Sequence, residues 1–468
     1  MILIFCLQLF MVICLVRASR EHLENALPVF AFFVTLMPLE SRLVIPGVFD
    51  LNSMRVCLVT LLALYFLRKG ERTQSAIPLK SLMLLHVAWA VCSTLYSLSV
   101  MTSVKQLISQ VLEYYLLYFL FIRTVTRLQT IYRIVFAMVM AMGFCSVCSL
   151  PEVYNHWSVL RIFPSNLWMT FNGVPDPLYI EWGRGLRARS TFEHPILFGD
   201  ALAMTIPLAL YLLSVWEGRR ARILLWLSLG IMVWALYKTS SRGPWIATIL
   251  CCALMFLLIN NQVRKYLTIV AILGAIVIVS RPGIWETIEG LYTATTDASS
   301  PVGASYLYRD TLNATIKNAV AQDTGRLLLG FGLGTFRELG LEITFLDVTQ
   351  RWYTCDNNWA AFLYETGYVG LILIGALLAG PLWISFRSYQ LLPKPENRFS
   401  GVLLISLSGF YFLLASVAGY SWGQQGDMAW ILISLVVCHS QLGWQDRDQE
   451  DELEEEIGGA NQYDLHVA

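Results

Sequence analysis

The feature that most constrains this chain is a repeated pattern of apolar runs, each near the ~20 residues that a helix needs to cross a bilayer. The predicted spans lie near residues 1–16, 25–38, 54–67, 81–99, 107–122, 131–149, 195–215, 222–237, 244–260, 266–280, 358–386, 400–418 and 427–440. The first three are short for a full crossing, so we expect about twelve or thirteen spans. The predicted fold class is therefore all-α, a polytopic membrane helix bundle with a large outward loop that contains short helices.

Composition agrees with this prediction. The chain of 468 residues is 56% hydrophobic but only 14% charged, whereas soluble domains are about 25% charged. Its 33 basic residues balance 33 acidic ones, so no basic excess indicates nucleic acid. The run 1–16 could also be read as a signal peptide. It lacks a basic first region and a clean small-residue cleavage site, so we treat it as a membrane segment.

Positive charges in the short connections predict the orientation. Lys and Arg concentrate in one set of short loops, which we assign to the cytoplasm. The predicted units are the N-terminal helices 1–149, a first long periplasmic loop 150–194, the central helices 195–280, a large periplasmic loop 281–357, the C-terminal helices 358–444 and an acidic cytoplasmic tail 445–468. The tail is dense in Asp and Glu, so we expect a solvated segment without regular structure, or at most a short frayed helix.

Four places at the outward ends of the spans carry polar residues. The first is the run 183–195, which contains Arg184, Arg187, Arg189 and His194. Guanidinium groups bind phosphate in a bidentate fork, so these arginines are candidates for a phosphate clamp. The alternative is a solvated basic loop that touches lipid headgroups.

The second place is Ser241-Arg242-Gly243, which opens a predicted span. Backbone N–H groups at a helix N-terminus add donors to Arg242, and this combination suits an anion. An arginine that extends along the membrane surface to reach water would look the same in sequence.

The third place is a predicted amphipathic helix in the large loop, with one apolar face formed by Leu307, Leu312, Ile316 and Val320. Arg309 on this helix either faces a site or pairs with Asp310 or solvent. The fourth place is Asp356-Asn357, where the chain re-enters the membrane. Either residue could cap the next helix, and Asp356 could instead be a general base at the bilayer edge.

Two other patterns indicate structure rather than a site. Gly330, Gly332 and Gly334 form a glycine-rich run, but no strand or βαβ unit surrounds them, so we predict a tight turn rather than a dinucleotide site. Of the ten cysteines only Cys355 lies in a long loop, which excludes an internal disulfide framework there.

The order of these motifs resembles the O-antigen ligase/polymerase superfamily of bacterial inner membranes, from about Gly183 to Gly370. The matching pattern is Arg189-x-Thr-Phe-x-His-Pro, then Ser-Arg-Gly-x-Trp, then the large loop with Arg309 and Gly-x-Gly-x-Gly, then Asp-Asn-x9-Gly-x-x-Gly. The resemblance implies a bundle similar to GT-C glycosyltransferases. It also implies inverting, metal-independent transfer of a glycan from undecaprenyl diphosphate to an acceptor hydroxyl at the periplasmic face.

The resemblance also implies roles for individual residues. Arg242 matches the arginine of the Ser-Arg-Gly motif, Arg309 matches the arginine of the loop helix, and Asp356 stands where the ligases carry a histidine. Asp356 departs from the ligase pattern and looks more like the polymerase or exopolysaccharide branches. The expected catalytic residues are Asp356, Arg309 and Arg242, and the expected substrate-binding residues are Arg189, Arg187, His194 and Asn357.

The expected partners are the lipid-linked glycan, an acceptor that is a glycan, lipid or protein, membrane lipid, and a chain-length regulator. No cofactor, metal or nucleic acid is expected. The competing hypothesis is a secondary transporter or lipid-linked glycan flippase, which would carry internal repeats and charged residues near the bilayer midplane. A third is a scaffold that assembles envelope enzymes through the acidic tail.

Overall fold

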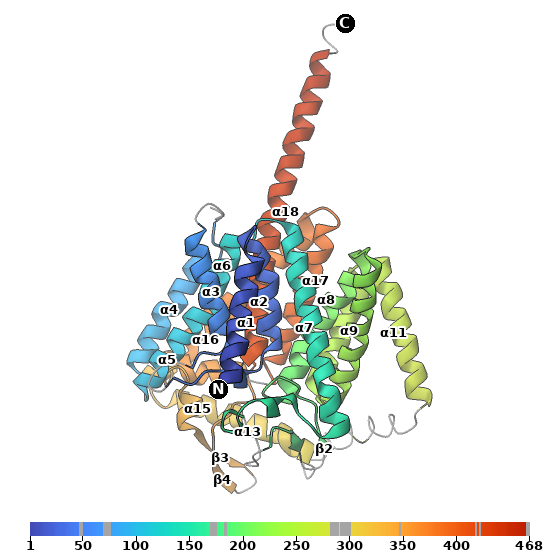
Figure 1. The fold of residues 1–468 in the computed structure, drawn as a ribbon. Helices are drawn as coiled ribbons and strands as arrows, with labels where there is room; N and C mark the ends of the chain where they lie inside the picture. Colours follow the sequence, from blue (N-terminus) through green and yellow to red (C-terminus); the bar gives the residue numbers. More distant parts are fainter. Residues whose placement is uncertain are drawn as a thin grey trace.

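The protein is a bundle of long helices with a smaller layer of loops, short helices and hairpins at one end (Figure 1). The computed structural model describes residues 1–45, 50–68, 76–168, 176–181, 185–280, 290, 301–345, 348–416, 419–420 and 423–464. Helices account for 77% of the structure, which confirms the predicted helical class.

The described residues of the N-terminal half form eight α-helices and a π-helical turn. Their bounds are α1 Ile2–Ala18, α2 Ala26–Leu36, α3 Ser53–Leu67, α4 Lys80–Leu95, α5 Val100–Gln110, the π-helix η4 Val111–Leu116, α6 Leu117–Thr124, α7 Leu128–Asn155 and α8 Pro195–Val215. Short 3-10 turns lie at η1 Leu23–Asn25, η2 Leu39–Ser41, η5 Val159–Ile162 and η6 Ser165–Leu167.

The C-terminal half contains the remaining long helices and the short helices of the large loop. Their bounds are α9 Arg219–Lys238, α10 Arg242–Leu258, α11 Asn261–Ser280, α13 Pro301–Ala321, α14 Thr324–Leu329, α15 Thr335–Leu339, α16 Asn358–Leu391, α17 Glu396–Leu413 and α18 Gly423–Asp464. Side chains cap several of these helices at their N-termini. Asn52 caps α3, His194 caps α8 and Asp323 caps α14 through hydrogen bonds to backbone N–H groups.

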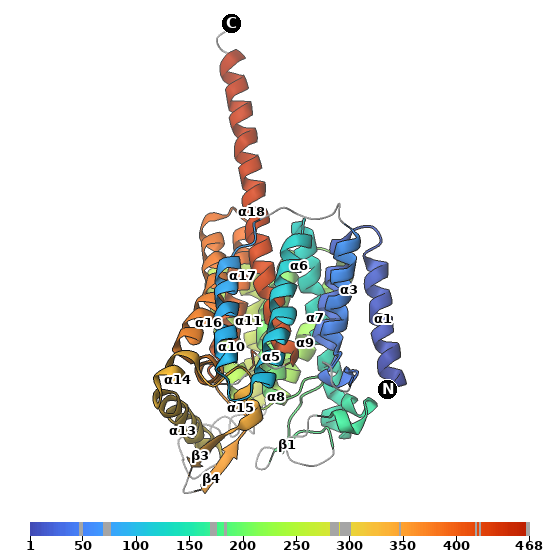
Figure 2. The same ribbon diagram turned by 90° about the vertical axis from the view of Figure 1, so that its left-hand side faces the viewer.

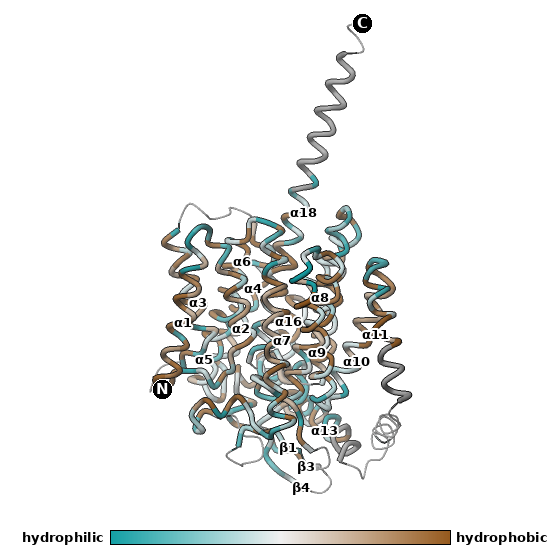
Figure 3. The backbone as a smooth tube through the Cα atoms, turned by 45° about the vertical axis from the view of Figure 1, so that its right-hand side comes forward, coloured by the Kyte–Doolittle hydropathy of each residue, from teal (hydrophilic) through white to brown (hydrophobic). Residues whose placement is uncertain are grey.

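Every predicted span contains a helix in the structure. Within the part of the chain that the structure describes, four helices are long and apolar enough to cross a membrane, namely α7, α8, α9 and α16, and several shorter apolar helices accompany them. Apolar residues cover the middle of the bundle and polar residues gather at its two ends (Figure 3). The structure is thus that of a helical membrane protein, and the exact number of spans stays a prediction.

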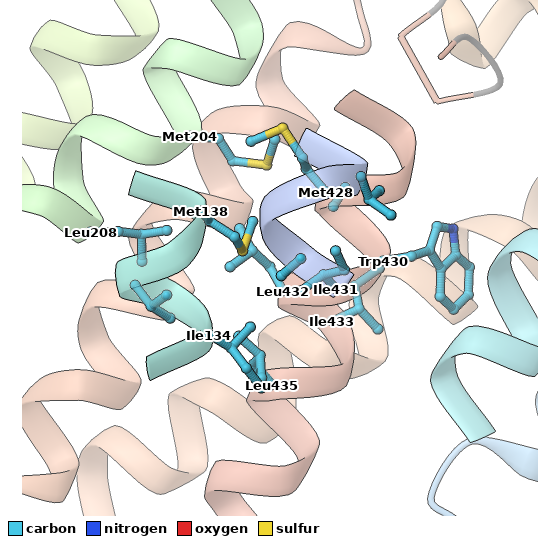
Figure 4. Packing of buried hydrophobic residues seen from close by; sticks show 14 of the residues in the cluster. Ile134, Met138, Met204, Leu208, Met428, Trp430, Ile431, Leu432, Ile433 and Leu435 are labelled. Atoms are coloured by element: carbon cyan, nitrogen blue, oxygen red, sulfur yellow. The ribbon is translucent and has the colours of Figure 1, made fainter. Parts of the chain in front are cut away.

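The first part of α18 lies at the centre of the bundle. Met428, Trp430, Ile431 and Leu432 are completely buried. Figure 4 shows Ile134 and Met138 of α7 and Met204 and Leu208 of α8 beside this part of α18. The ring of Trp430 points away from them and stacks on Tyr114, with ring centroids 5.5 Å apart. The same helix continues as a single rod to Asp464 and projects away from the bundle (Figure 1). The expectation of a tail without regular structure is therefore wrong, because the buried first half nucleates the helix and elongation is easier than nucleation.

The two long connections lie at the end of the bundle opposite this rod, which we call the loop end (Figures 1 and 2). The loop end carries α13 to α15 and two antiparallel hairpins that were not predicted. The first pairs β1 Ile180–Glu181 with β2 Gly185–Leu186, and the second pairs β3 Leu341–Phe345 with β4 Val348–Trp352. These strands are too short to give a clear alternating signal in sequence.

Candidate active site

The fourth motif forms the corner at which the large loop turns into α16. Asn357 is the N-cap, because its Oδ1 accepts hydrogen bonds from the backbone N–H groups of Trp359 at 3.0 Å and Ala360 at 3.4 Å. Asp356 therefore does not cap the helix. Of the two readings open for Asp356 in sequence, the cap is excluded, and the role as a general base stays a prediction.

The loop helix α13 docks on this corner through two adjacent polar contacts. Arg309 places Nη2 at 3.5 Å from Oδ2 of Asp356, and Asn313 accepts a hydrogen bond at 3.1 Å from Nδ2 of Asn357. Positions 309 and 313 are four apart and so lie on the same side of the helix. Arg309 thus pairs with Asp356 rather than with its neighbour Asp310.

An apolar face holds α13 in this position. Tyr308, Leu312, Ile316 and Val320 are buried in a small core with Leu363 and Tyr364 of α16. Three of the four predicted face residues are confirmed, but Leu307 is 39% exposed and Tyr308 takes its place. Positions 308, 312, 316 and 320 are four residues apart, so one side of the helix is buried along this length.

The Arg309–Asp356 pair lies at a partly open surface. The side chains are 28% and 38% exposed, so both groups can meet a ligand. Nε of Arg309 is buried and has no hydrogen-bond partner among the described residues. Loss of water around the carboxylate raises the pKa of Asp356, and the guanidinium of Arg309 opposes the rise. The pair combines a cationic donor with a carboxylate that is a better base than a free Asp.

Arg242 is the first residue of α10. The start of α10 and the start of α16 both contact the end of α17. A Cβ on Gly243 would contact Leu413 and Ser416 at 3.4 Å, and the backbone N–H of Asn358 donates to the carbonyl of Leu414 at 2.8 Å. The end of α17 therefore separates the N-termini of α10 and α16 at the loop end. Arg242 is partly buried and belongs to the same region as Arg309 and Asp356.

Arg187 of the first motif has a different position, because it is buried within the protein. It is 2% exposed and joins three segments: Nε donates to the carbonyl of Thr239 at 2.9 Å, Nη2 to Oγ of Ser241 at 2.7 Å, and Nη1 to the carboxylate of Glu181. This arrangement fixes the turn from which Arg242 emerges. The sequence suggested that Arg187 is either part of an exposed phosphate clamp or part of a loop that touches lipid headgroups. Its burial fits neither interpretation.

Arg189 and His194 are also held by the protein. Arg189 is 1% exposed; Nη1 donates to the carbonyl of Glu193 at 2.9 Å, and burial lowers the pKa of its guanidinium, while nearby carboxylates led by Glu40 oppose the shift. His194 accepts from the N–H of Ile196 through Nδ1 and contacts the hydroxyl of Tyr179 through Nε2. Arg184 lies outside the described residues.

Gly367, the first glycine of the fourth motif, interrupts α16. Gly367 has φ of 68°, and a Cβ there would come within 2.1 Å of the Leu328 carbonyl oxygen, so only glycine fits. The interruption frees backbone carbonyls near the loop end. The carbonyl of Tyr364 accepts from the N–H of Phe331 at 2.8 Å, and that of Glu365 accepts from the N–H of Gly332 at 2.9 Å.

The glycine-rich run is the segment that fills this interruption. Gly330, Gly332 and Gly334 all have positive φ and form the turn between α14 and α15, which confirms the predicted turn. A Cβ on Gly330 would lie 2.5 Å from backbone atoms of Glu365 and Thr366. The two glycine motifs are therefore the two sides of one backbone-to-backbone contact between the large loop and α16.

Comparison with known proteins agrees with these motifs. Residues 227–375 match a family model described as O-antigen ligase. The match supports the O-antigen ligase/polymerase superfamily. A search of the curated proteins found no match.

The O-antigen ligase match covers α9 to the first half of α16. It contains Arg242, Arg309, Asp356 and Asn357, whereas Arg187, Arg189 and His194 lie before it. The division follows the structure, because Arg309, Asp356 and Asn357 form the partly open corner and the residues before the match stabilise the first long connection. Arg242 is separated from this corner by the end of α17. Together with the apolar helices, the match indicates an integral membrane protein.

Sequence reasoning did not single out three charged residues that lie outside the corner at Asp356. Glu113 and Asp427 lie inside predicted spans, and Arg55 lies at the start of another. Charged residues within apolar spans are rare and mark functional positions. That signal was available in the sequence, but it does not show which charged residues meet.

Proposed function

We propose that this protein transfers a glycan from an undecaprenyl-diphosphate carrier to an acceptor hydroxyl at the periplasmic face of the bacterial inner membrane. The reaction would be polymerisation of polysaccharide repeat units or ligation of O-antigen. The observation that carries the proposal is the Arg309–Asp356 pair, which lies 3.5 Å apart at the loop end inside the O-antigen ligase match. In this proposal the loop end faces the periplasm, the acidic tail is cytoplasmic, and the bundle is similar to GT-C enzymes.

The roles follow from the charge that moves in the reaction. The acceptor oxygen attacks the anomeric carbon from the face opposite the diphosphate, so the configuration inverts. The bond from that carbon to the diphosphate oxygen breaks, and the lipid diphosphate leaves with the electron pair. Asp356 takes the proton of the acceptor hydroxyl. Arg309 and Arg242 stabilise the departing diphosphate, and preorganised donors of this kind are worth about 3–4 kcal/mol each.

The first-loop residues have a supporting role in this proposal. Arg187 and Arg189 are buried, so they would orient the segment that presents Arg242 rather than touch the diphosphate. Asn357 would fix the start of α16, and His194 the start of α8, through their capping bonds. In this proposal, the four residues that were expected to bind substrate instead position other parts of the site.

The structure also offers a reason to prefer an enzyme over a transporter. Transporters use interrupted helices whose free carbonyls coordinate ions. Here the carbonyls beside Gly367 bond to protein groups, including Oγ of Ser93 and Nε1 of Trp89 as well as the glycine-rich turn. The interruption of α16 therefore anchors the large loop, and the transporter and flippase alternatives gain no support from it.

The test is glycan transfer in membranes from cells that lack the chromosomal gene. Wild-type protein should restore transfer, and Asp356→Asn and Arg309→Ala should not. If both variants transfer glycan near the wild-type rate, the proposal fails. Surface polysaccharide from the deletion strain then distinguishes the two reactions. Single repeat units retained on the carrier indicate polymerisation, and long chains stranded on the carrier indicate ligation.

A further inference from the structure

A polar cavity of about 170 Å³ lies at the loop end, beside the first turns of α18. Its walls come from the end of α2, the start of α3, α5 with the π-helical turn, and the start of α18. Glu193 from the first long connection and Arg337 from α15 complete it. Parts of the chain that are distant in sequence therefore meet around one hollow.

Several ionisable side chains line the cavity. Arg55 and Glu113 form an ion pair at 2.6 Å, and Arg55 also donates to Oγ of Ser109 at 3.0 Å. Asp427 is 8% exposed and lines the same space. Glu193 is 4% exposed, and its Oε2 is buried with no hydrogen-bond partner among the described residues. A buried carboxylate oxygen in this state costs free energy unless a ligand or water satisfies it.

The charge of the walls indicates which ligand fits. Three carboxylates and two arginines line the cavity, so the fully ionised site carries a net charge of −1. Burial raises the pKa of Glu193 to about 7, and Arg337 opposes the rise. A neutral Glu193 can also donate a hydrogen bond. Whether Glu193 is ionised or neutral, the walls carry no excess of positive charge for a diphosphate. They do offer hydrogen-bond acceptors, the amide group of Gln106 and the aromatic ring of Tyr114.

The cavity is close to the proposed catalytic corner. The hydroxyl of Tyr114 donates to the carbonyl of Tyr420 at 2.8 Å, and the backbone N–H of Tyr420 donates to Oδ1 of Asn358 at 2.9 Å. Asn358 is the second residue after Asp356. Tyr420 therefore links the wall of the cavity to the start of α16, next to Asp356.

We propose that this cavity binds a sugar ring of the acceptor glycan, with Glu193 and Asp427 as hydrogen-bonding partners of its hydroxyl groups. The inference rests on the proposed function and adds where the acceptor binds. A volume well below the ~300–1,000 Å³ of drug-sized sites suits a single ring rather than a long chain. The donor diphosphate would stay at Arg309 and Arg242, so donor and acceptor are separated by charge.

The test is equilibrium binding of a phosphate-free glycan to the full-length protein in lipid nanodiscs. The probe represents the acceptor of the polymerisation reaction. It is the repeat-unit glycan released by mild acid from the lipid-linked pool of the deletion strain, treated with phosphatase and labelled at its reducing end. We expect saturable binding to wild type and binding at least about 10-fold weaker in Glu193→Gln and Asp427→Asn. Inorganic pyrophosphate should not compete.

Controls keep the test independent of folding and of catalysis. Glu342→Gln makes the same chemical change on strand β3, where the side chain is 63% exposed, and should bind the glycan as wild type does. Gln106→Ala provides a second cavity variant if Glu193→Gln lowers the unfolding temperature. Equal binding by the cavity variants, competition by pyrophosphate, or no binding by wild type would overturn the proposal. None of these results depends on transfer, so they are distinct from failure of the proposed function.

Discussion

The guanidinium of Arg309 in α13 and the carboxylate of Asp356 before α16 approach to 3.5 Å, and the next polar pair, Asn313 and Asn357, lies beside them. A helix of the large loop is therefore fixed at the corner where the chain re-enters the bundle. Both side chains of the first pair remain partly exposed, so a ligand can reach them, and an exposed pair of this kind adds little stability. We therefore expect changes at this corner to alter the reaction, and changes in the contacts around it to alter stability.

Replacing Arg309 should lower the rate of glycan transfer far more than replacing another arginine of the large loop. Removal of one preorganised donor from a charged transition state costs about 10²–10³-fold in rate, so we expect a fall of that order in Arg309→Ala. Arg351→Ala is the matched control, because Arg351 pairs with Glu342 at 2.7 Å on an exposed hairpin. Initial rates in membranes measure the difference. Equal rates for the two variants would contradict the assignment.

The pH profile should report the ionisation of Asp356. The base must be deprotonated, so the rate falls as pH drops through its pKa, and burial places that pKa above the ~3.9 of a free Asp. Arg309 lowers this pKa, so residual activity in Arg309→Gln should show its acidic limb at higher pH. The limb should be missing from any residual activity of Asp356→Asn. An unchanged acidic limb in that variant would assign it to another group.

Replacing Arg187 should lower the stability of the protein rather than act directly on the rate of glycan transfer. Arg187→Ala leaves Glu181 and Ser241 without their buried partner. Breaking a fully buried pair costs roughly 3–5 kcal/mol, and we expect about 2 kcal/mol or more here because Glu181 is 33% exposed. The unfolding temperature of the purified protein measures the loss.

The control for Arg187 is Arg161→Ala in the same connection. Arg161 pairs with Asp176 at 2.6 Å, but both side chains are more than 30% exposed, so little stability should be lost. If Arg187→Ala unfolds at the wild-type temperature and instead raises the KM for the lipid donor, then Arg187 contacts the diphosphate after all.

Gly367 should tolerate no side chain. A Cβ would collide with the Leu328 carbonyl oxygen at 2.1 Å, and φ of 68° disfavours other residues. We expect Gly367→Ala to lower the yield of folded protein and to release the large loop from α16. Gly375→Ala is the control, because Gly375 lies in the same helix and a Cβ there would meet no atom within 4 Å among the described residues. Equal yields and melting temperatures for the two variants would rule out the close contact.

The contact between Asn313 and Asn357 should stabilise the docking of α13. Loss of this hydrogen bond in Asn313→Ala costs about 1 kcal/mol, so α13 should exchange its amide hydrogens faster. Asn318→Ala changes the same residue type at an exposed position of the same helix and should leave exchange unchanged. Hydrogen exchange of α13 in nanodiscs makes the comparison. Faster exchange in both variants alike would point to helix propensity rather than docking.

Much of the local structure could be predicted from sequence because it depends on short-range patterns. The apolar runs determine where helices form, and each predicted span contains one. The glycine run predicts a turn, and Leu312, Ile316 and Val320 predict the buried face of α13. The prediction for the end of the tail is wrong, because composition shows its polarity but not that α18 already starts inside the core.

Only the tertiary structure decided which polar residues meet. The sequence offered Asp356 and Asn357 equally as a cap, and the fold assigns the cap to Asn357 and joins Asp356 to Arg309. It offered three arginines in the first motif as one clamp, and the fold buries Arg187 and Arg189. Helical periodicity is a property of neighbouring residues, whereas these pairings close long loops and depend on how helices pack. The sequence by itself thus determined the helices and the residue types available for chemistry, and packing determined the site.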